Sequence, residues 1–326
     1  MDLEASKRAG LARSGEVGII ILSGYQTTPM RLPFPAIAVA LSLAAAPPAC
    51  TGGGPEPAPA EDCASTPVIF VHGLDQNAAI FAPAVAYLSA HGIGASCLHA
   101  VELSPRDGDN IRAAQEQIAP FVEDILGTTN RARAAAGLAP IDKVHLVAHS
   151  MGALSGRWYA AVLHPERVAT FIATSGANHG TNWHCDRPIG PGHRQMCPAF
   201  AASAEHNALQ FRLNGAPGPD VDETPYGVGR DSAGVRTVPP DGARSILYVT
   251  LHADGDPYVV PAASLLLDGA GWKNLQLDPA LAAEPSPGNF QLRRPSGHDE
   301  LLSSPAALRW LLQVLSQTTG NPAGHP

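Results

Sequence analysis

Short apolar runs recur along the chain and constrain its fold more than any other feature. The runs with the composition of buried strands lie at 67–71, 143–149, 168–176 and 245–252. A continuous apolar run indicates a strand that is covered on both faces, as in a parallel sheet. The sequence therefore predicts an α/β fold, in which a mostly parallel sheet has helices on both faces.

Weaker patterns predict further elements between and after these runs. Helices are expected near 78–90, 109–136, 152–163, 199–213 and 306–315, and further strands near 95–101 and 289–293. Pro120 and Gly127 are candidates for a break in the second of these helices. Residues 177–244 are rich in Pro and Gly, and we expect an irregular, lid-like insert there.

The N-terminal part has the features of an export signal. After Met30, one arginine precedes an apolar stretch at 36–46, which is shorter than the roughly 20 residues of a membrane span. We therefore expect an N-terminal extension and signal peptide at 1–49, a Gly/Pro/Ala-rich tether at 50–62, and one folded domain at 63–326. The protein is predicted to be exported.

The cysteines agree with export. Of the five, Cys50 stands directly after the apolar stretch and before the tether. This position resembles the lipidated cysteine of bacterial lipoproteins, although Pro-Pro-Ala before it departs from the usual leucine-containing pattern. Cys50 is therefore a candidate membrane tether, and simple secretion is the alternative. The other four cysteines are free to pair in an oxidising compartment.

Charge and composition exclude one class of partner. The formal net charge is −8 and no basic run or glycine-rich phosphate loop is present, which argues against nucleic acid. Hydrophobic residues make up 45% of the chain, enough for a sizeable core. We expect a monomer.

Three polar residues follow predicted strands in an order that indicates nucleophilic catalysis. The stretch VHLVAHSMGALSG at 144–156 places Ser150 in a sharp turn between a strand and a helix. Asp256 follows the strand at 245–252, and His298 follows the strand near 289–293. Serine, then acid, then histidine is the order of a nucleophile elbow and its partners. His298 would take the serine proton, and Asp256 would orient the imidazole.

Such a serine also needs two N–H donors for the oxyanion that forms during acyl transfer. One candidate is the backbone N–H of Met151, which follows Ser150 at a helix N-terminus. The second donor is expected in the loop after VIFVHG, with Leu74 preferred over Asp75. Ala148 and Gly152 are small enough for the sharp turn that this arrangement requires.

These motifs carry a family resemblance. VIFVHGL, AHSMG, GANHGT, ILYVTLHADGDPYV and SGHDELL resemble the small bacterial α/β-hydrolase lipases and esterases, the Bacillus type included. The resemblance covers 63–317, is weak across 182–244, and explains Ala148, because an A-x-S-x-G elbow is usual in that family. It implies the α/β-hydrolase fold, no cofactor, a triad of Ser150, Asp256 and His298, and oxyanion donors at Leu74 and Met151.

A narrower resemblance concerns the cysteines. Cys63, shortly before PVIFVHG, and Cys97, one strand–helix unit later, are similar to those of secreted polyhydroxybutyrate depolymerases with lipase-like domains. This resemblance implies a disulfide between Cys63 and Cys97. Cys185 and Cys197 would then close the irregular insert.

The expected function is that of an exported serine carboxylic-ester hydrolase, a lipase or esterase that acts on apolar acyl esters. A polyhydroxyalkanoate depolymerase and an acyltransferase are alternatives within the enzymes. A catalytically silent hydrolase fold that serves as a surface binding module is the alternative outside them.

Several residue assignments have competitors. Asp254 competes with Asp256 and His252 with His298, while His72 and His149 are expected to position loops. A structural metal is an alternative for one cluster, although the usual tight spacings are absent. Its members are His179, His184, Cys185, Asp186 and His193. The aromatic candidates for an acyl groove or for the core are Trp183, Phe200, Phe211 and Trp310.

Overall fold

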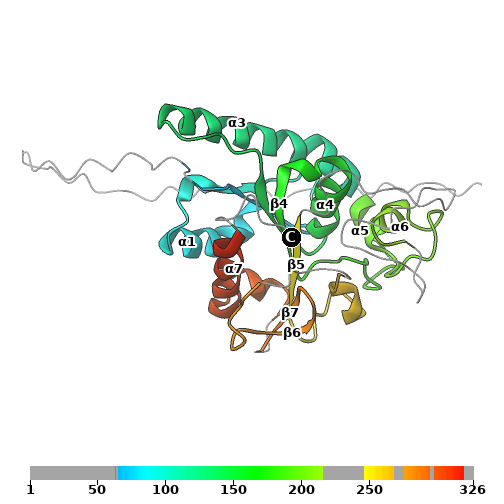
Figure 1. Cartoon of the computed structure of the whole chain (residues 1–326). Coiled ribbons are helices and arrows are strands. Elements are labelled where there is room, and N and C mark those ends of the chain that lie inside the picture. The colour runs from blue at the N-terminus through cyan, green and yellow to red at the C-terminus, as the bar shows by residue number, and fades with distance from the viewer. Residues whose placement is uncertain (1–62, 64, 216–245, 268–274, 294–296, 319–326) are drawn as a thin grey trace, which may run out of the picture. The chain divides into compact units, whose positions relative to one another are not determined.

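A computed structural model describes residues 63, 65–215, 246–267, 275–293 and 297–318, and Figure 1 shows them in colour. The expected signal peptide, the tether with Cys50 and residues 216–244 of the expected insert lie outside the described residues.

The described strands form one sheet in the order β2-β1-β3-β4-β5-β7-β6. These are β1 (Val68–Val71), β2 (Leu98–Val101), β3 (Val144–His149), β4 (Val168–Thr174), β5 (Leu247–His252), β6 (Ala282–Ser286) and β7 (Asn289–Leu292). Neighbouring strands are parallel except for β6 and β7. The predicted mostly parallel sheet of an α/β fold is confirmed. The sequence analysis missed β6, whose Glu284 and Pro285 suit an edge strand and weaken the strand signal.

The described helices lie between and after these strands. They are α1 (Ala82–Ala90), α2 (Asn110–Arg112), α3 (Ala119–Ala135), α4 (Gly152–Trp158), α5 (Gly190–Met196), α6 (Ala208–Asn214) and α7 (Pro305–Thr318). A π-helical segment, Ala113–Ile118, joins α2 to α3, and another, Tyr159–Leu163, extends α4. Neither Pro120 nor Gly127 ends α3. Pro120 occupies its first turn, where proline is tolerated, and Gly127 lies in its interior.

The helix predicted near 199–213 is shorter than expected, because α6 begins only at Ala208. The sequence analysis missed α5, which lies before it. Asn207 caps α6, because its side-chain oxygen accepts the N–H of Gln210 at 3.1 Å. This cap stabilises a helix start at Ala208, although the composition alone suggests a helix that begins earlier.

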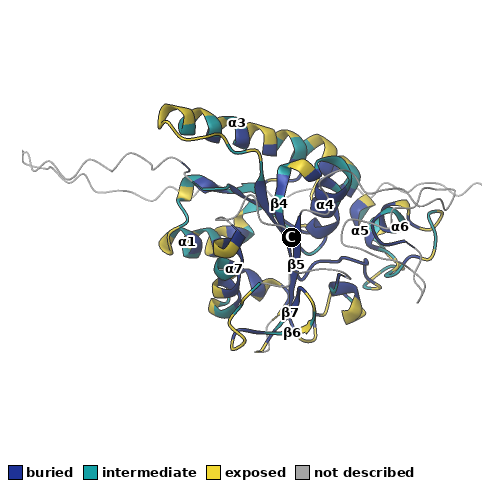
Figure 2. Ribbon diagram, viewed as in Figure 1, coloured by how far each residue is buried: buried dark blue, intermediate teal, exposed yellow. Residues whose placement is uncertain are grey.

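The core lies on both faces of the sheet. Alternate residues of β1 belong to different apolar clusters: Val68 and Phe70 pack with α1 and α7, whereas Ile69 and Val71 pack with α3 and α4. This follows from the two-residue period of a strand. Figure 1 shows α3 and α1/α7 on opposite sides of the sheet, and Figure 2 shows the strands buried beneath helices with exposed outer faces.

Two disulfides join segments of the domain. Cys63 pairs with Cys97 at a Cα–Cα distance of 4.9 Å, which links the chain before β1 to the start of β2. Cys185 pairs with Cys197 at 5.5 Å and closes a loop that contains α5. These are the pairings that the resemblance implied. Among the described residues, none of the helices has the length and apolar character that a bilayer span requires.

Candidate active site

Ser150 occupies a strained turn between β3 and α4. Its φ is 55°, in the left-handed region that non-glycine residues rarely adopt. The Ser150 N–H donates to the carbonyl oxygen of Thr174 at 3.2 Å, which holds the turn against β4. A Cβ added at Gly152 would lie 2.5 Å from the carbonyl oxygen of His72, so only glycine allows α4 to start this close to β1. The sequence thus builds the sharp elbow that the serine motif predicted.

His298 and Asp256 form a buried pair. The Nδ1–H of His298 donates to Asp256 Oδ2 at 2.7 Å. The other carboxylate oxygen accepts the N–H groups of Tyr258 and Val259 at 2.9 and 3.0 Å. Burial opposes ionisation of Asp256, but the bonds from His298 and from the two amides outweigh it and lower its pKa. An ionised Asp256 fixes the tautomer of His298 and leaves Nε2 available as a base.

The competing residues lie elsewhere. Asp254 is exposed, whereas Asp256 is buried and holds the imidazole. His252 is buried at the end of β5, where burial lowers its pKa. The pair that the structure brings together is therefore Asp256 and His298.

Ser150 and His298 line one pocket of about 250 Å³. The lining of this pocket includes the apolar or aromatic residues Trp183, Ile189, Met196 and Tyr258. Ile189 and Met196 belong to the loop that the Cys185–Cys197 disulfide closes. The pocket can accept an uncharged, apolar group beside the serine.

Two backbone amides are candidates to receive negative charge. Leu74 lines the pocket, and Met151 stands at the start of α4, where the first N–H groups of a helix have no partner within it. The N–H of Asp75 donates to the carbonyl oxygen of Arg106 at 3.1 Å, so this amide is occupied. The geometry therefore favours Leu74 over Asp75 as the second donor.

The histidines that flank the site have structural partners. The Nδ1–H of His72 donates to the carbonyl oxygen of Gly73 at 3.0 Å, and its Nε2 accepts the Leu103 N–H at 2.9 Å. His149 contacts the Thr174 carbonyl oxygen through Nδ1 at 2.9 Å and Asp299 Oδ1 through Nε2 at 3.0 Å. Both side chains hold loops, as the sequence analysis expected.

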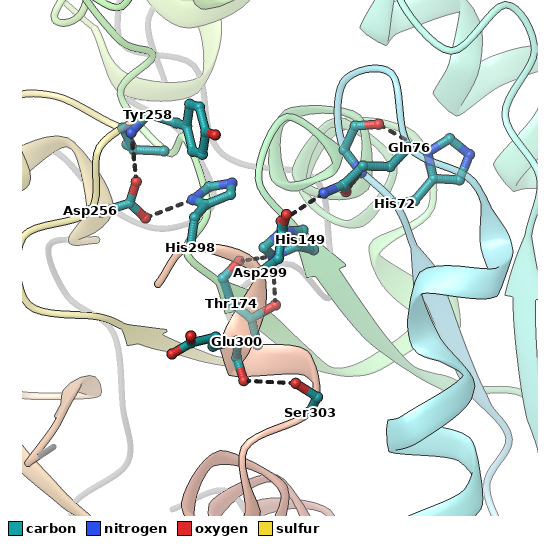
Figure 3. A network of polar contacts seen from close by, with 12 residues as sticks. His72, Gln76, His149, Thr174, Asp256, Tyr258, His298, Asp299, Glu300 and Ser303 are labelled. Carbon is teal, nitrogen blue, oxygen red and sulfur yellow. Dashed lines mark hydrogen bonds and ion pairs between the residues drawn. The ribbon is translucent and has the colours of Figure 1, made fainter. Parts of the chain in front are cut away.

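The sequence analysis missed Gln76 and Asp299. Both line the pocket, and Gln76 Nε2 donates to Asp299 Oδ1 at 2.8 Å. Figure 3 shows this contact beside the pair of Asp256 and His298. Asp299 directly follows His298 in the sequence, but no spacing rule points to Gln76.

The candidate metal ligands do not converge on one point. Cys185 is in a disulfide, and the two ring nitrogens of His193 bond to the Ile189 N–H and the Trp183 carbonyl oxygen. His149, His298 and Asp299 each bring one ligand atom within 4.8 Å of the others. Tetrahedral zinc ligands at 2.0–2.1 Å lie roughly 3.4 Å apart, so this cluster has the geometry of hydrogen-bonded side chains.

Of the four aromatic candidates for the acyl groove, Trp183 lines the pocket. Trp310 is core, fully buried against Phe290 at a ring-centroid distance of 5.4 Å. Phe200 stacks on His179 at 4.7 Å, and Phe211 lies half-buried on α6.

No family model matches the chain. Among solved structures, it is similar to Aspergillus fumigatus lipase B at 18% identity and a TM-score of 0.45, over 78% of this chain and 53% of that one. A pyrethroid hydrolase from Sphingobium faniae aligns at 18% identity and a TM-score of 0.41, over 80% and 99%. A Bacillus licheniformis lipase aligns at 19% identity and a TM-score of 0.35, over 60% and 69%. These values are too low to transfer a substrate or a site residue, so the chemistry of the site must follow from its own side chains.

Proposed function

We propose that this protein is an exported serine hydrolase that cleaves carboxylic esters of apolar acyl groups. The observation that carries the proposal is the buried pair of Asp256 and His298, in a pocket that also contains Ser150 on a positive-φ turn. A hydroxyl, an oriented imidazole and a carboxylate are the parts that acyl transfer through a serine requires.

The proposed reaction has two halves. Ser150 Oγ attacks the ester carbonyl carbon while its proton passes to His298 Nε2, and the N–H groups of Leu74 and Met151 stabilise the oxyanion. The carbon–oxygen bond to the alcohol then breaks, the alcohol takes the proton from His298, and an acyl-serine remains. Water attacks this ester, its proton passes to His298 and then to Ser150 Oγ, and the acid leaves.

The walls of the pocket support an apolar acyl substrate. Trp183, Met196 and Val259 line it together with the half-exposed Ile189 and Tyr258. Burial of apolar surface contributes about 25 cal/mol per Å², so a longer acyl chain should bind more tightly until the wall ends. Glycerides and p-nitrophenyl esters fit this description.

A polyester is the second candidate substrate, for one specific reason. Ile189 and Tyr258 are 45% and 44% exposed at the pocket, so apolar surface continues outward from the site. An extended polymer chain could lie on such a rim. Clearing of a polyhydroxyalkanoate suspension, compared with hydrolysis of tributyrin, separates the two substrates.

Export is supported by the two disulfides, because such bonds persist in oxidising compartments. We further propose that Cys50 anchors the chain to the envelope through a lipid. Cell fractionation tests this anchor, because Cys50→Ala should move the protein from the membrane fraction to the soluble one.

The decisive test of the catalytic proposal uses Ser150→Ala. This variant should lose ester hydrolysis and labelling by a fluorophosphonate probe, while its thermal melt stays close to that of the parent. A parent protein that folds but neither hydrolyses esters nor takes the probe would instead be a binding module.

A further inference from the structure

The carboxylate of Asp299 lies beside the proposed triad without belonging to it. Its Oδ1 accepts a hydrogen bond from Gln76 Nε2 at 2.8 Å and faces His149 Nε2 at 3.0 Å. His149 is fully buried, whereas the Asp299 side chain is 59% exposed. This oxygen atom therefore links Gln76 and His149, which are distant in the sequence, as Figure 3 shows.

Gln76 connects this oxygen to the loop that carries Leu74. Its Oε1 accepts the N–H of Gly73 at 2.9 Å, while its Nε2 is the donor to Asp299. Gly73 packs closely on the elbow, since a Cβ there would lie 2.6 Å from Ser150 Cβ. The side-chain amide of Gln76 therefore holds the backbone at Gly73, which directly precedes the proposed oxyanion donor Leu74.

His149 connects the same oxygen to the elbow. It is the last residue of β3 and directly precedes Ser150. Its Nε2–H donates to Asp299 Oδ1, because a carboxylate can only accept, and its Nδ1 then lies 3.5 Å from the Thr174 hydroxyl, which can donate to it. Burial lowers the pKa of His149, and the bond to Asp299 acts in the opposite direction.

The third connection is covalent, because Asp299 follows His298 in the chain. The rings of His149 and His298 also lie against each other, with centroids 4.7 Å apart. A displacement of Asp299 would therefore move the base, the elbow and the oxyanion loop relative to one another.

We propose that Asp299 is a positioning residue that holds the loops of Leu74, Ser150 and His298 in register through Gln76 and His149. The inference rests on the proposed function, since register between these loops matters only if they act together. Displacement of a reacting group by 1 Å can reduce a rate about 100-fold. Binding of the apolar acyl group depends on apolar lining residues such as Trp183 and Met196 and should change little.

Steady-state kinetics on a p-nitrophenyl ester test the proposal. Asp299→Ala should lower kcat by about 10- to 100-fold with KM within about twofold of the parent. Asp299→Asn keeps an acceptor oxygen at the same place and should recover part of this loss. Asp124→Asn, which removes an exposed carboxylate on α3, is the charge-matched control and should keep the parent kcat.

A double-mutant cycle tests whether Gln76 and Asp299 act as one unit. Gln76→Ala should also lower kcat, and the double variant with Asp299→Ala should be about as slow as the slower single variant. The rates are normalised to the concentration of sites that the fluorophosphonate probe titrates, which removes any loss of folded protein. Gln76→Ala leaves the contact between Asp299 and His149 in place, so it also tests the network if Asp299→Ala does not fold.

Parent kcat in both Asp299→Ala and Gln76→Ala would overturn the proposal, as would losses that multiply in the double variant. These outcomes are separate from a failure of the proposed function. If Ser150→Ala keeps its activity, the serine mechanism fails whatever Asp299 does. If Ser150→Ala is inactive while the Asp299 and Gln76 variants match the parent, only the network is wrong.

Discussion

His298 Nδ1 lies 2.7 Å from Asp256 Oδ2, and this bond joins the loop after β5 to the loop after β7. Both side chains are nearly excluded from solvent, at 5% exposure for His298 and 0% for Asp256. A charge-assisted bond in such a site is stronger and more directional than one at the surface. The bond engages Nδ1 of His298, so Nε2 is the nitrogen available for the proposed role as a base.

Asp256→Asn should therefore abolish most activity without unfolding the protein. The amide can hold the ring in the wrong tautomer and cannot stabilise an imidazolium, so kcat should fall roughly 10³- to 10⁴-fold. Asp254→Asn changes an exposed carboxylate in the same turn and should retain nearly all activity. Kinetics on both variants check the assignment, and it is wrong if Asp254→Asn is the slower of the two.

Gly73→Ala should disturb the elbow. The added Cβ would lie 2.6 Å from Ser150 Cβ and 3.1 Å from the His149 carbonyl oxygen. We expect a loss of about 1–3 kcal/mol of stability and a lower kcat, because overpacking moves the backbone. Gly94→Ala is the control, since the nearest atom to its Cβ would be 3.7 Å away. Thermal melts and kinetics measure both effects, and equal melts for the two variants would contradict the prediction.

The two disulfides should have different roles. In the chain-entropy model, the bond between Cys63 and Cys97 closes 34 residues and contributes about 4 kcal/mol. The bond between Cys185 and Cys197 closes 12 residues and contributes about 3 kcal/mol. Only the second constrains Ile189 and Met196 at the pocket, so its removal should also raise KM.

Paired serine substitutions test this difference. The variant with Cys63→Ser and Cys97→Ser should unfold at a lower denaturant concentration and keep its KM at 25 °C. The variant with Cys185→Ser and Cys197→Ser should show a KM several-fold above the parent for long acyl chains. An unchanged KM in the second variant would mean that the loop holds its shape without the bond.

His145 should make the protein sensitive to acid. It lies fully buried in β3, and within the described part of the chain neither ring nitrogen has a hydrogen-bond partner. Burial lowers its pKa from 6.5 to about 4. Between pH 6.5 and 4, His145 therefore binds a proton in the unfolded chain but stays neutral in the folded chain. The free energy of unfolding falls as pH drops through this range, by up to about 3 kcal/mol.

Urea midpoints at pH 7 and pH 5 for the parent and for His145→Leu measure this effect. The substitution changes stability at both pH values, so only the difference between them is informative. The variant should lose less stability on acidification than the parent. Equal losses would show that other buried histidines, such as His252, dominate the acid response.

Sequence patterns were sufficient for the central strands and for three residues that the structure brings to the candidate site. Strands β1, β3, β4 and β5 are continuous apolar runs because both faces of the sheet are covered, and this burial is visible in composition. Ser150, Asp256 and His298 follow strands, so parallel topology places them at one edge of the sheet. The edge strand β6 and the short helix α5 were missed because half-exposed segments with Pro and Gly lack such a pattern.

What the amino-acid sequence alone determined is the covered parallel sheet, the small-residue elbow at Ser150 and the residue types of the proposed chemistry. Only the tertiary structure shows that Asp256 bonds to His298 and that the amide of Asp75 is occupied by the Arg106 carbonyl oxygen, because burial and hydrogen bonding differ between residues one or two positions apart. It also revealed the contact of Gln76 with Asp299, across 223 positions. Contacts between distant loops depend on how the sheet aligns its strand ends, and no local pattern in the sequence records that alignment.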